Sequence, residues 1–263
     1  MYKDILVAII EDDLFSLNWM SLLLVRDWRT RVVSGIQNAE QLNRTLNEFQ
    51  NRIDFFLVDI DAINSDCELT DICKLIYQKN EKAKIIFIGV GPSKSVFKYM
   101  QNLNCFGYIN KNEIRFSLSW AISLAAEGNF VLTRSTFDLF NQANYILPQN
   151  KLILKGRDFF LGLTDRENEV AKLAIIFSLG RRDLADELKI SDQWCYGLVS
   201  ELYTKLGIGD ILSGDVDPSI FFGESKVIND HYKEIITQLK TSTKARDLET
   251  LAFHLLTMPI IED

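Results

Sequence analysis

The sequence predicts an α/β domain with a doubly wound parallel sheet of five strands, followed by an all-helical region. In the first half of the chain, short apolar runs such as 55–58 alternate with longer segments, such as 14–27, in which apolar residues recur every three to four positions. Later segments keep the helical spacing without such strands. At 263 residues, the chain is long enough for two domains.

The expected elements follow from this alternation. We predict strands near 5–10, 31–34, 55–58, 84–88 and 107–109, with helices near 14–27, 38–49, 69–78, 94–103 and 114–126. Residues 134–158, which include Pro148 and Gly156, are typical of a linker with a short helix around 134–143.

Charged residues follow three of these strands. Glu11 and Asp12 come directly after the first strand. Asp59 ends the third strand, and Lys111 follows the fifth. The carboxyl ends of parallel strands meet at one edge of the sheet, so we expect these side chains to share one crevice. Clustered carboxylates repel one another unless a cation lies among them, and Mg²⁺ with oxygen ligands is the usual solution.

This constellation resembles the receiver domain of bacterial response regulators. The resemblance implies that Asp59 accepts a phosphoryl group from a histidine kinase and that Lys111 pairs with the phosphoryl oxygens. It also implies a Mg²⁺ ion bound directly by Asp12, Asp59 and the main-chain carbonyl of Asp61. Glu11 would bind the ion through water. Asp61 is a nearby alternative acid, although the spacing favours Asp59 as phosphoacceptor.

The chemistry agrees with these residue types. A carboxylate attacks phosphorus only if its own charge and the charge of the phosphoryl oxygens are offset, which the metal and Lys111 would do. The family places a Thr or Ser hydroxyl at the end of the fourth strand, where this chain has Gly89. Tyr108 occupies the aromatic switch position, but glycine offers no side-chain hydrogen bond. We therefore expect phosphorylation with an altered or lost switch.

The second domain begins with a helix signal. Thr164 followed by Glu167 forms a capping box. The sequence from there to Gly207 and Ile208 resembles the LuxR-type helix-turn-helix, so the whole layout is similar to response regulators of the NarL/FixJ class. We expect a receiver domain over 1–133, a linker over 134–158, a LuxR-type helix-turn-helix domain over 159–212 and a helical C-terminal extension over 213–263.

The expected DNA-contact positions differ from that family. Trp194, Tyr196 and Leu198 stand in the recognition helix where the family has Thr, Lys and often His. Residues 161–210 contain six basic and nine acidic side chains, a net charge of −3. Phosphate contacts supply most non-specific affinity, so we expect DNA binding to be weak. The basic residues left for phosphate contacts are Arg181, Arg182 and Lys205.

Several readings of the second half stay open. Trp and Tyr are enriched at protein interfaces, so the recognition-helix surface suits a protein partner, but these residues would equally fill the domain's own core or pack on the receiver domain. Apolar residues predict two amphipathic helices within 227–239 and 248–256. These helices would pack on the helix-turn-helix or form a homodimer or partner surface. We interpret His231 and His254 as members of the two apolar stripes.

Two functions of different class remain. One is a cytoplasmic, phosphorylation-controlled transcription regulator. The other is a signalling adaptor that keeps the fold but binds protein. We expect no enzymatic activity of its own, since outside the Asp59 pocket no catalytic triad or Gly-rich phosphate loop is present. No apolar run is long enough for a membrane span, the start does not resemble a signal peptide, and Cys67, Cys73, Cys105 and Cys195 form no CxxC pair.

Overall fold

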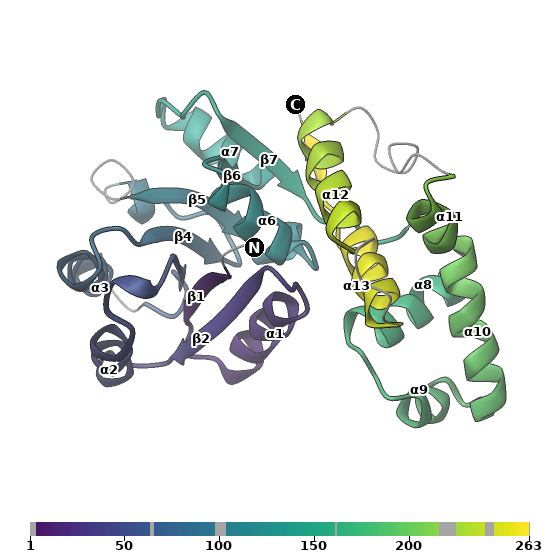
Figure 1. The fold of residues 1–263 in the computed structure, drawn as a ribbon. Helices are drawn as coiled ribbons and strands as arrows, with labels where there is room; N and C mark the ends of the chain where they lie inside the picture. Colours follow the sequence, from purple (N-terminus) through teal and green to yellow (C-terminus); the bar gives the residue numbers. More distant parts are fainter. Residues whose placement is uncertain are drawn as a thin grey trace. The chain divides into compact units, whose positions relative to one another are not determined.

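The structure is a computed structural model that describes residues 4–63, 66–97, 104–160, 162–215, 225–239 and 245–262 (Figure 1). The chain forms two compact units. One comprises residues 1–156 together with 261–263, and the other comprises residues 157–260. Within the described ranges, no helix has the length and apolar character needed to cross a lipid bilayer.

The first unit is built on an eight-stranded sheet in the order β2-β1-β3-β4-β5-β6-β7-β8. The strands are β1 (Ile5–Ile10), β2 (Thr30–Ile36), β3 (Phe55–Asp59), β4 (Lys84–Gly89), β5 (Cys105–Asn110), β6 (Phe130–Leu132), β7 (Lys151–Lys155) and β8 (Ile260–Glu262). Every pair from β1 to β7 is parallel, which brings the carboxyl ends of these strands to one edge.

Helices cover both faces of this sheet (Figure 1). They are α1 (Leu14–Val25), α2 (Ala39–Phe49), α3 (Asp66–Lys79), α5 (Lys111–Ile114), α6 (Leu118–Ala126) and α7 (Arg134–Gln142), with 3-10 turns at Gln50–Arg52 and Lys94–Val96. The apolar residues of α2, α3 and α7 join one core cluster with the sheet. Helices α1 and α6 contact each other. The side chain of Asp13 begins α1 by accepting from the Ser16 amide at 2.7 Å.

The predicted architecture is confirmed, namely a parallel α/β sheet followed by a helical region. The five predicted strands correspond to β1 to β5. The sheet is larger than predicted by three strands, β6, β7 and β8. Of these, β7 lies in the expected linker 134–158, which also contains the expected short helix, now α7. The reason is the run Leu152-Ile153-Leu154, of which Ile153 and Leu154 are buried beside β6. The linker prediction was therefore wrong for this segment.

The second unit is helical. Its elements are α8 (Asp165–Ala171), a π-helical turn (Lys172–Ile176), α9 (Arg181–Leu188), α10 (Asp192–Lys205), α11 (Ile208–Ser213), α12 (Lys226–Leu239) and α13 (Ala245–Leu256). The predicted capping box is confirmed: the Thr164 amide donates to Glu167 Oε2 at 2.8 Å, and the Glu167 amide donates to Thr164 Oγ1 at 3.3 Å.

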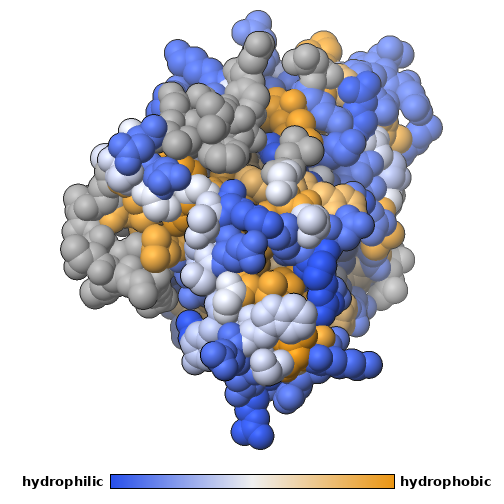
Figure 2. All heavy atoms as spheres, turned by 90° about the vertical axis from the view of Figure 1, so that its right-hand side faces the viewer, coloured by the Kyte–Doolittle hydropathy of each residue, from blue (hydrophilic) through white to orange (hydrophobic). Residues whose placement is uncertain are grey.

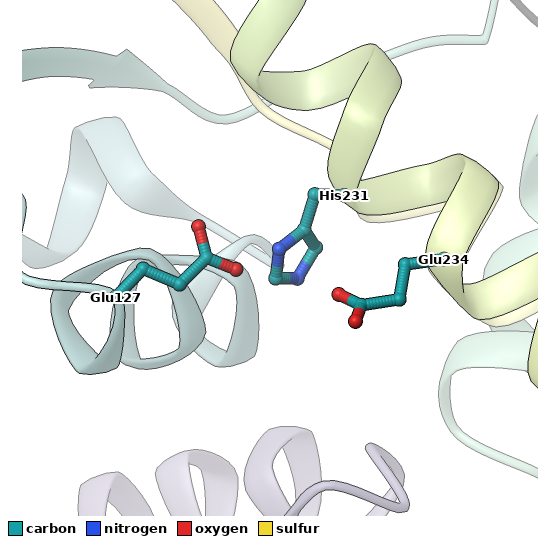
Figure 3. A group of neighbouring side chains, drawn as sticks. All are labelled: Glu127, His231 and Glu234. Carbon is teal, nitrogen blue, oxygen red and sulfur yellow. The ribbon is translucent and has the colours of Figure 1, made fainter.

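Both helices expected in the C-terminal extension are confirmed as α12 and α13. His231 and His254 are buried, as expected for members of the apolar stripes. Figure 3 shows His231 and Glu234 projecting from the same side of α12, as a three-residue spacing on a helix requires. The extension is not only helical, since it ends in β8, the last strand of the sheet. The breaks expected at 217–218 and 241–243 lie outside the described residues.

Candidate functional site: an acid and lysine cluster at the strand ends

Three of the predicted site residues meet at the carboxyl edge of the sheet. Glu11 follows β1, Asp59 ends β3 and Lys111 follows β5. The Lys111 ammonium donates to Glu11 Oε2 at 2.7 Å and also pairs with Asp59 Oδ2. Its third partner is Ser16 Oγ at 2.9 Å. The parallel pairing of β1, β3, β4 and β5 is what brings residues from distant parts of the sequence together.

The cluster is almost closed to solvent. Glu11 is 2% exposed and Asp59 is 1% exposed. Burial raises the pKa of Asp59, and the neighbouring Glu11 raises it further, to about 7, against the opposing effect of Lys111. Burial also raises the pKa of Glu11, but hydrogen bonds with Asp59, Lys111 and Ser16 outweigh it and lower that pKa to about 2. Two buried carboxylates thus share one ammonium, which favours binding of a further cation or proton.

Backbone amides fix the orientation of both carboxylates. The Asp13 amide donates to Glu11 Oε1 at 3.1 Å, and the Asp61 amide donates to Asp59 Oδ1 at 3.0 Å. Each of these oxygens has a second lone pair. Hard carboxylate oxygens are the donors that Mg²⁺ prefers, so the chemistry of the set fits this ion.

The structure does not bring Asp12 and Asp61 into the same enclosed position. Both are exposed. Glu11, Asp12 and Asp59 are all among the described residues, and their carboxylate oxygens do not all lie within 4.8 Å of one another. Direct ligation by Asp12 therefore requires its side chain to turn inward. Asp61, the alternative acid, accepts a hydrogen bond at Oδ2 from the Val90 amide at 2.5 Å.

Ser16 was not predicted from the sequence. Its hydroxyl accepts from Lys111, while its amide is bound by the Asp13 cap. A signal was present, because the third residue after an N-cap lies in the first turn of the helix, next to the strand end that the helix follows.

The position of Gly89 is filled by a neighbour. A Cβ atom built there would lie 2.7 Å from Ile60 Cγ1 and 3.2 Å from Asp61 Oδ2. A Thr or Ser at this position would thus require Ile60 to move. Gly89 therefore lacks the family's hydroxyl, and Ile60 occupies the space that a larger side chain would need.

Tyr108, the expected switch residue, is fully buried. Its hydroxyl donates to the Gly91 carbonyl at 3.0 Å and accepts from the Ser93 amide at 2.7 Å. Burial raises the pKa of this phenol, so it remains protonated and able to donate. The side chain already has backbone partners that do not involve the cluster.

Of the predicted DNA contacts of the second unit, Lys205 has acidic partners within the unit. Arg181 and Arg182 are exposed at the start of α9. The Lys205 ammonium pairs with Glu167 and lies 3.4 Å from Glu201 Oε1. These acids compete with DNA phosphates for Lys205, so the pairs weaken its value as a phosphate contact.

The recognition-helix surface of α10 is aromatic. Trp194 is 60% exposed and Tyr196 is 52% exposed, so neither fills the core of the unit, whereas Leu198 is half-buried. The guanidinium carbon of Arg181 lies 3.8 Å from the centre of the Tyr196 ring, a cation–π contact. The face of the molecule in Figure 2 is mostly hydrophilic, with separate hydrophobic patches among the polar atoms.

Comparison with known structures gave several matches. A structure of two RcsB dimers bound to two parallel DNAs is 16% identical with a TM-score of 0.48, covering 78% of this chain and 93% of that chain. The isolated REC domain of RcsB from Salmonella enterica serovar Typhimurium, with the phosphomimetic BeF3-, is 16% identical with a TM-score of 0.45, covering 52% and 99%. No conclusion about this chain rests on these likenesses.

No protein-family model and no curated protein sequence matched the chain.

Proposed function

We propose that this chain is a response regulator of two-component signalling, in which Asp59 accepts a phosphoryl group from a histidine kinase and the second unit acts on transcription. The observation that supports this most is the meeting of Glu11, Asp59 and Lys111 from three different strands. A lone acid at a strand end has many structural roles. A buried pair of acids around one lysine at the topological switch point of a doubly wound sheet is far more specific.

In the proposed reaction, an oxygen of Asp59 forms a bond to phosphorus while the bond from phosphorus to the donor's imidazole nitrogen breaks. The electron pair of that bond stays on the nitrogen. Lys111, already bound to Asp59, offsets the charge of the phosphoryl oxygens. Mg²⁺, held by Asp12, Asp59, the Asp61 carbonyl and water-linked Glu11, would supply further positive charge at those oxygens.

We also propose that phosphorylation has a weak effect on conformation. Ile60 fills the space beside Gly89 where the family's hydroxyl would lie. The Tyr108 hydroxyl is held by Gly91 and Ser93. Gly89 therefore offers no hydroxyl to bind a new phosphoryl group, and Tyr108 is held where it is by backbone hydrogen bonds.

Acetyl phosphate with Mg²⁺, followed by mass spectrometry of peptides, tests the phosphoacceptor. We expect one added phosphoryl group on Asp59, absent from Asp59→Asn and retained in the matched control Asp61→Asn. Because the acyl phosphate is labile, a parallel sample would be treated with borohydride, which reduces the acyl carbon to an alcohol, releases phosphate and leaves a stable homoserine that marks the modified residue. Phosphorylation of Asp61 in the wild type, or an unchanged yield in Asp59→Asn, would refute the assignment.

For the second unit, the proposed role is that of a LuxR-type helix-turn-helix. Helices α9 and α10 meet at the turn Lys189–Ser191, and the side chain of Ser191 caps α10 by accepting from the Trp194 amide at 3.2 Å. With a net charge of −3 over 161–210, we propose weak DNA binding that dimerisation through α12 and α13 would strengthen. The proposed location is the cytoplasm.

The alternative function is a signalling adaptor that binds a protein partner. Exposed Trp194 and Tyr196 favour it, since these residue types dominate binding energy at protein interfaces. The pairing of Lys205 with Glu167 and Glu201 also favours an adaptor, because it makes this lysine less available to DNA phosphates.

A salt-titrated DNA-binding measurement on the full chain separates the two functions. Arg182→Ala is the cleaner probe, because Arg181 contacts Tyr196 and its removal would disturb the aromatic surface as well. A DNA regulator should lose affinity and salt dependence in Arg182→Ala. An adaptor should be unchanged there, while Trp194→Ala should weaken its protein complex by roughly 2 kcal/mol.

A further inference from the structure

The lysine of the acid and lysine cluster stands on a very short helix. Lys111 is the first residue of α5, which has four residues. A helix of about one turn has little stability of its own, so its position must come from its neighbours. The Lys111 ammonium contacts Glu11, Asp59 and Ser16, and these contacts depend on where α5 begins. The groups that hold α5 therefore bear on the geometry of the cluster.

The residue before Lys111 is held to the start of α7. The Asn110 amide donates to Thr133 Oγ1 at 2.9 Å, and the side-chain amide of Asn110 donates to Ser135 Oγ at 3.1 Å. The side-chain oxygen of Asn110 accepts from the Asn112 amide at 2.9 Å and so caps α5. Asn110 and Thr133 are both buried. The first residue of α5 is thus fixed by its own cap and by α7.

The other end of α5 is held by α7 and by the residue that follows β7. The Ser135 amide donates to Glu113 Oε2 at 3.0 Å, and the Gly156 amide donates to the Glu113 carbonyl at 2.8 Å. A Cβ atom at Gly156 would lie 2.2 Å from the Ile114 carbonyl oxygen, so a larger residue would push the two backbones apart. Glu113 therefore joins α5 to both neighbours.

We propose that Asn110 and Glu113 are positioning residues that set the place of the Lys111 ammonium, and that α7 and β7 serve the site through them. They act through the backbone of α5. A displacement of about 1 Å lowers reactivity by up to about 100-fold, so small shifts of α5 matter. The charge of Glu113 is not required, because an amide oxygen would accept equally from Ser135. The effect on phosphoryl transfer rests on the proposed function, whereas the placement of the ammonium does not.

Lysine-selective NMR of the ammonium group tests the placement on the full chain without Mg²⁺, in the cold and at mildly acidic pH, where exchange with water is slow. An ammonium held by three acceptors should give a resolved signal, which Lys111→Arg assigns by its absence. We expect Glu113→Ala and Asn110→Ala to shift or broaden that signal, and Glu113→Gln to preserve it. The matched control Ser34→Ala removes a side-chain hydrogen bond with Thr45 elsewhere in the first unit and should preserve it as well.

Gly156→Ala tests the attachment to β7. It should displace α5 and change the ammonium signal, whereas Gly209→Ala should not, because an added Cβ there meets nothing within 4 Å. The initial rate of phosphorylation by acetyl phosphate with Mg²⁺ is the second readout. We expect it to fall about tenfold in Glu113→Ala and Gly156→Ala, and to stay within about twofold of the wild type in Glu113→Gln.

The two readouts separate this inference from the proposed function. An ammonium signal that is unchanged in Glu113→Ala and Gly156→Ala would overturn the inference. So would a wild-type chain without a protected Lys111 signal, or an equal change in Glu113→Gln. If the wild type is phosphorylated, unchanged rates in the two variants would overturn it too. A wild type that takes up no phosphoryl group, but whose ammonium signal responds as expected, would overturn the proposed function and support the placement.

Discussion

The first unit buries some of its charged pairs, whereas the charged pairs described in the second unit are at least partly exposed. In the first unit, Asp27 is fully buried with Arg29, whose Nη2 lies 2.6 Å from Asp27 Oδ2, and the acid and lysine cluster is similarly enclosed. In the second unit, charged pairs such as Arg166 with Glu169 are about half exposed. A buried charge needs a specific partner, whereas an exposed charge is served by water. Buried charges therefore mark the part of the chain where residue identity is most constrained.

The largest expected effect on stability comes from removing a buried carboxylate in the first unit, which we compare with removal of an exposed carboxylate in the second. Asp27→Ala takes away the carboxylate that holds the buried Arg29 through two hydrogen bonds of 2.9 and 2.6 Å. We expect the free energy of unfolding to fall by about 3 to 5 kcal/mol. Glu169→Ala, the exposed counterpart, should cost about 0 to 1 kcal/mol. Urea unfolding of both variants checks this, and similar losses would remove the distinction between the units.

Asp59→Asn should raise the free energy of unfolding, whereas Asp27→Ala should lower it. The pKa of Asp59 in the folded chain is raised to about 7, so its ionised form opposes folding, increasingly as the pH rises from about 4 to 7. Asparagine removes that charge. We expect a gain of roughly 2 kcal/mol at pH 8 in the presence of EDTA, falling toward zero near pH 4. Thermal unfolding at both pH values measures it; a loss of stability at pH 8 would contradict the buried excess of negative charge.

Tyr108→Phe tests whether the switch residue is fixed by the backbone. The variant leaves the Gly91 carbonyl and the Ser93 amide without their bonds to the hydroxyl, and we expect a loss of about 1.5 kcal/mol. Because those bonds do not involve the cluster, the yield of phosphorylation by acetyl phosphate should stay the same. Unchanged stability would mean that the hydroxyl is not held as the structure has it.

The smallest effect is expected in the second unit, at its first helix. Thr164→Ala removes the N-cap of α8, which should cost about 1 kcal/mol. Thr164→Ser keeps the hydroxyl and serves as the matched control. Denaturant unfolding followed by far-ultraviolet circular dichroism compares the two, and equal stability would show that the capping box contributes little here.

The strand-end rule explains why the centre of the site was predictable. Glu11, Asp59 and Lys111 stand at the ends of apolar runs, and parallel pairing places the carboxyl ends of these strands together at one edge of the sheet. Side-chain packing is not encoded in such local patterns. The filling of the space beside Gly89 by Ile60 depends on a rotamer, and the exposure of Asp12 depends on the path of a loop.

The strands beyond β5 were missed for a related reason. Lys151-Leu152-Ile153-Leu154-Lys155 is too short to separate a buried strand from other apolar segments by periodicity. β8 is shorter still, with three residues. Their place in the sheet comes from pairing with a neighbour that is distant in sequence, and no local propensity carries that information.

Strand β8 also makes the first unit discontinuous along the chain. Residues 261–263 belong to it although the whole of 157–260 intervenes, and Glu262 Oε1 lies 3.7 Å from Lys155 Nζ. During synthesis on the ribosome, the last strand of this sheet emerges only after every helix of the second unit. A chain shortened after α13 would leave β7 as a bare edge, open to pairing with other molecules. Cutting the protein near residue 156 would likewise leave a strand of the first unit attached to the wrong fragment.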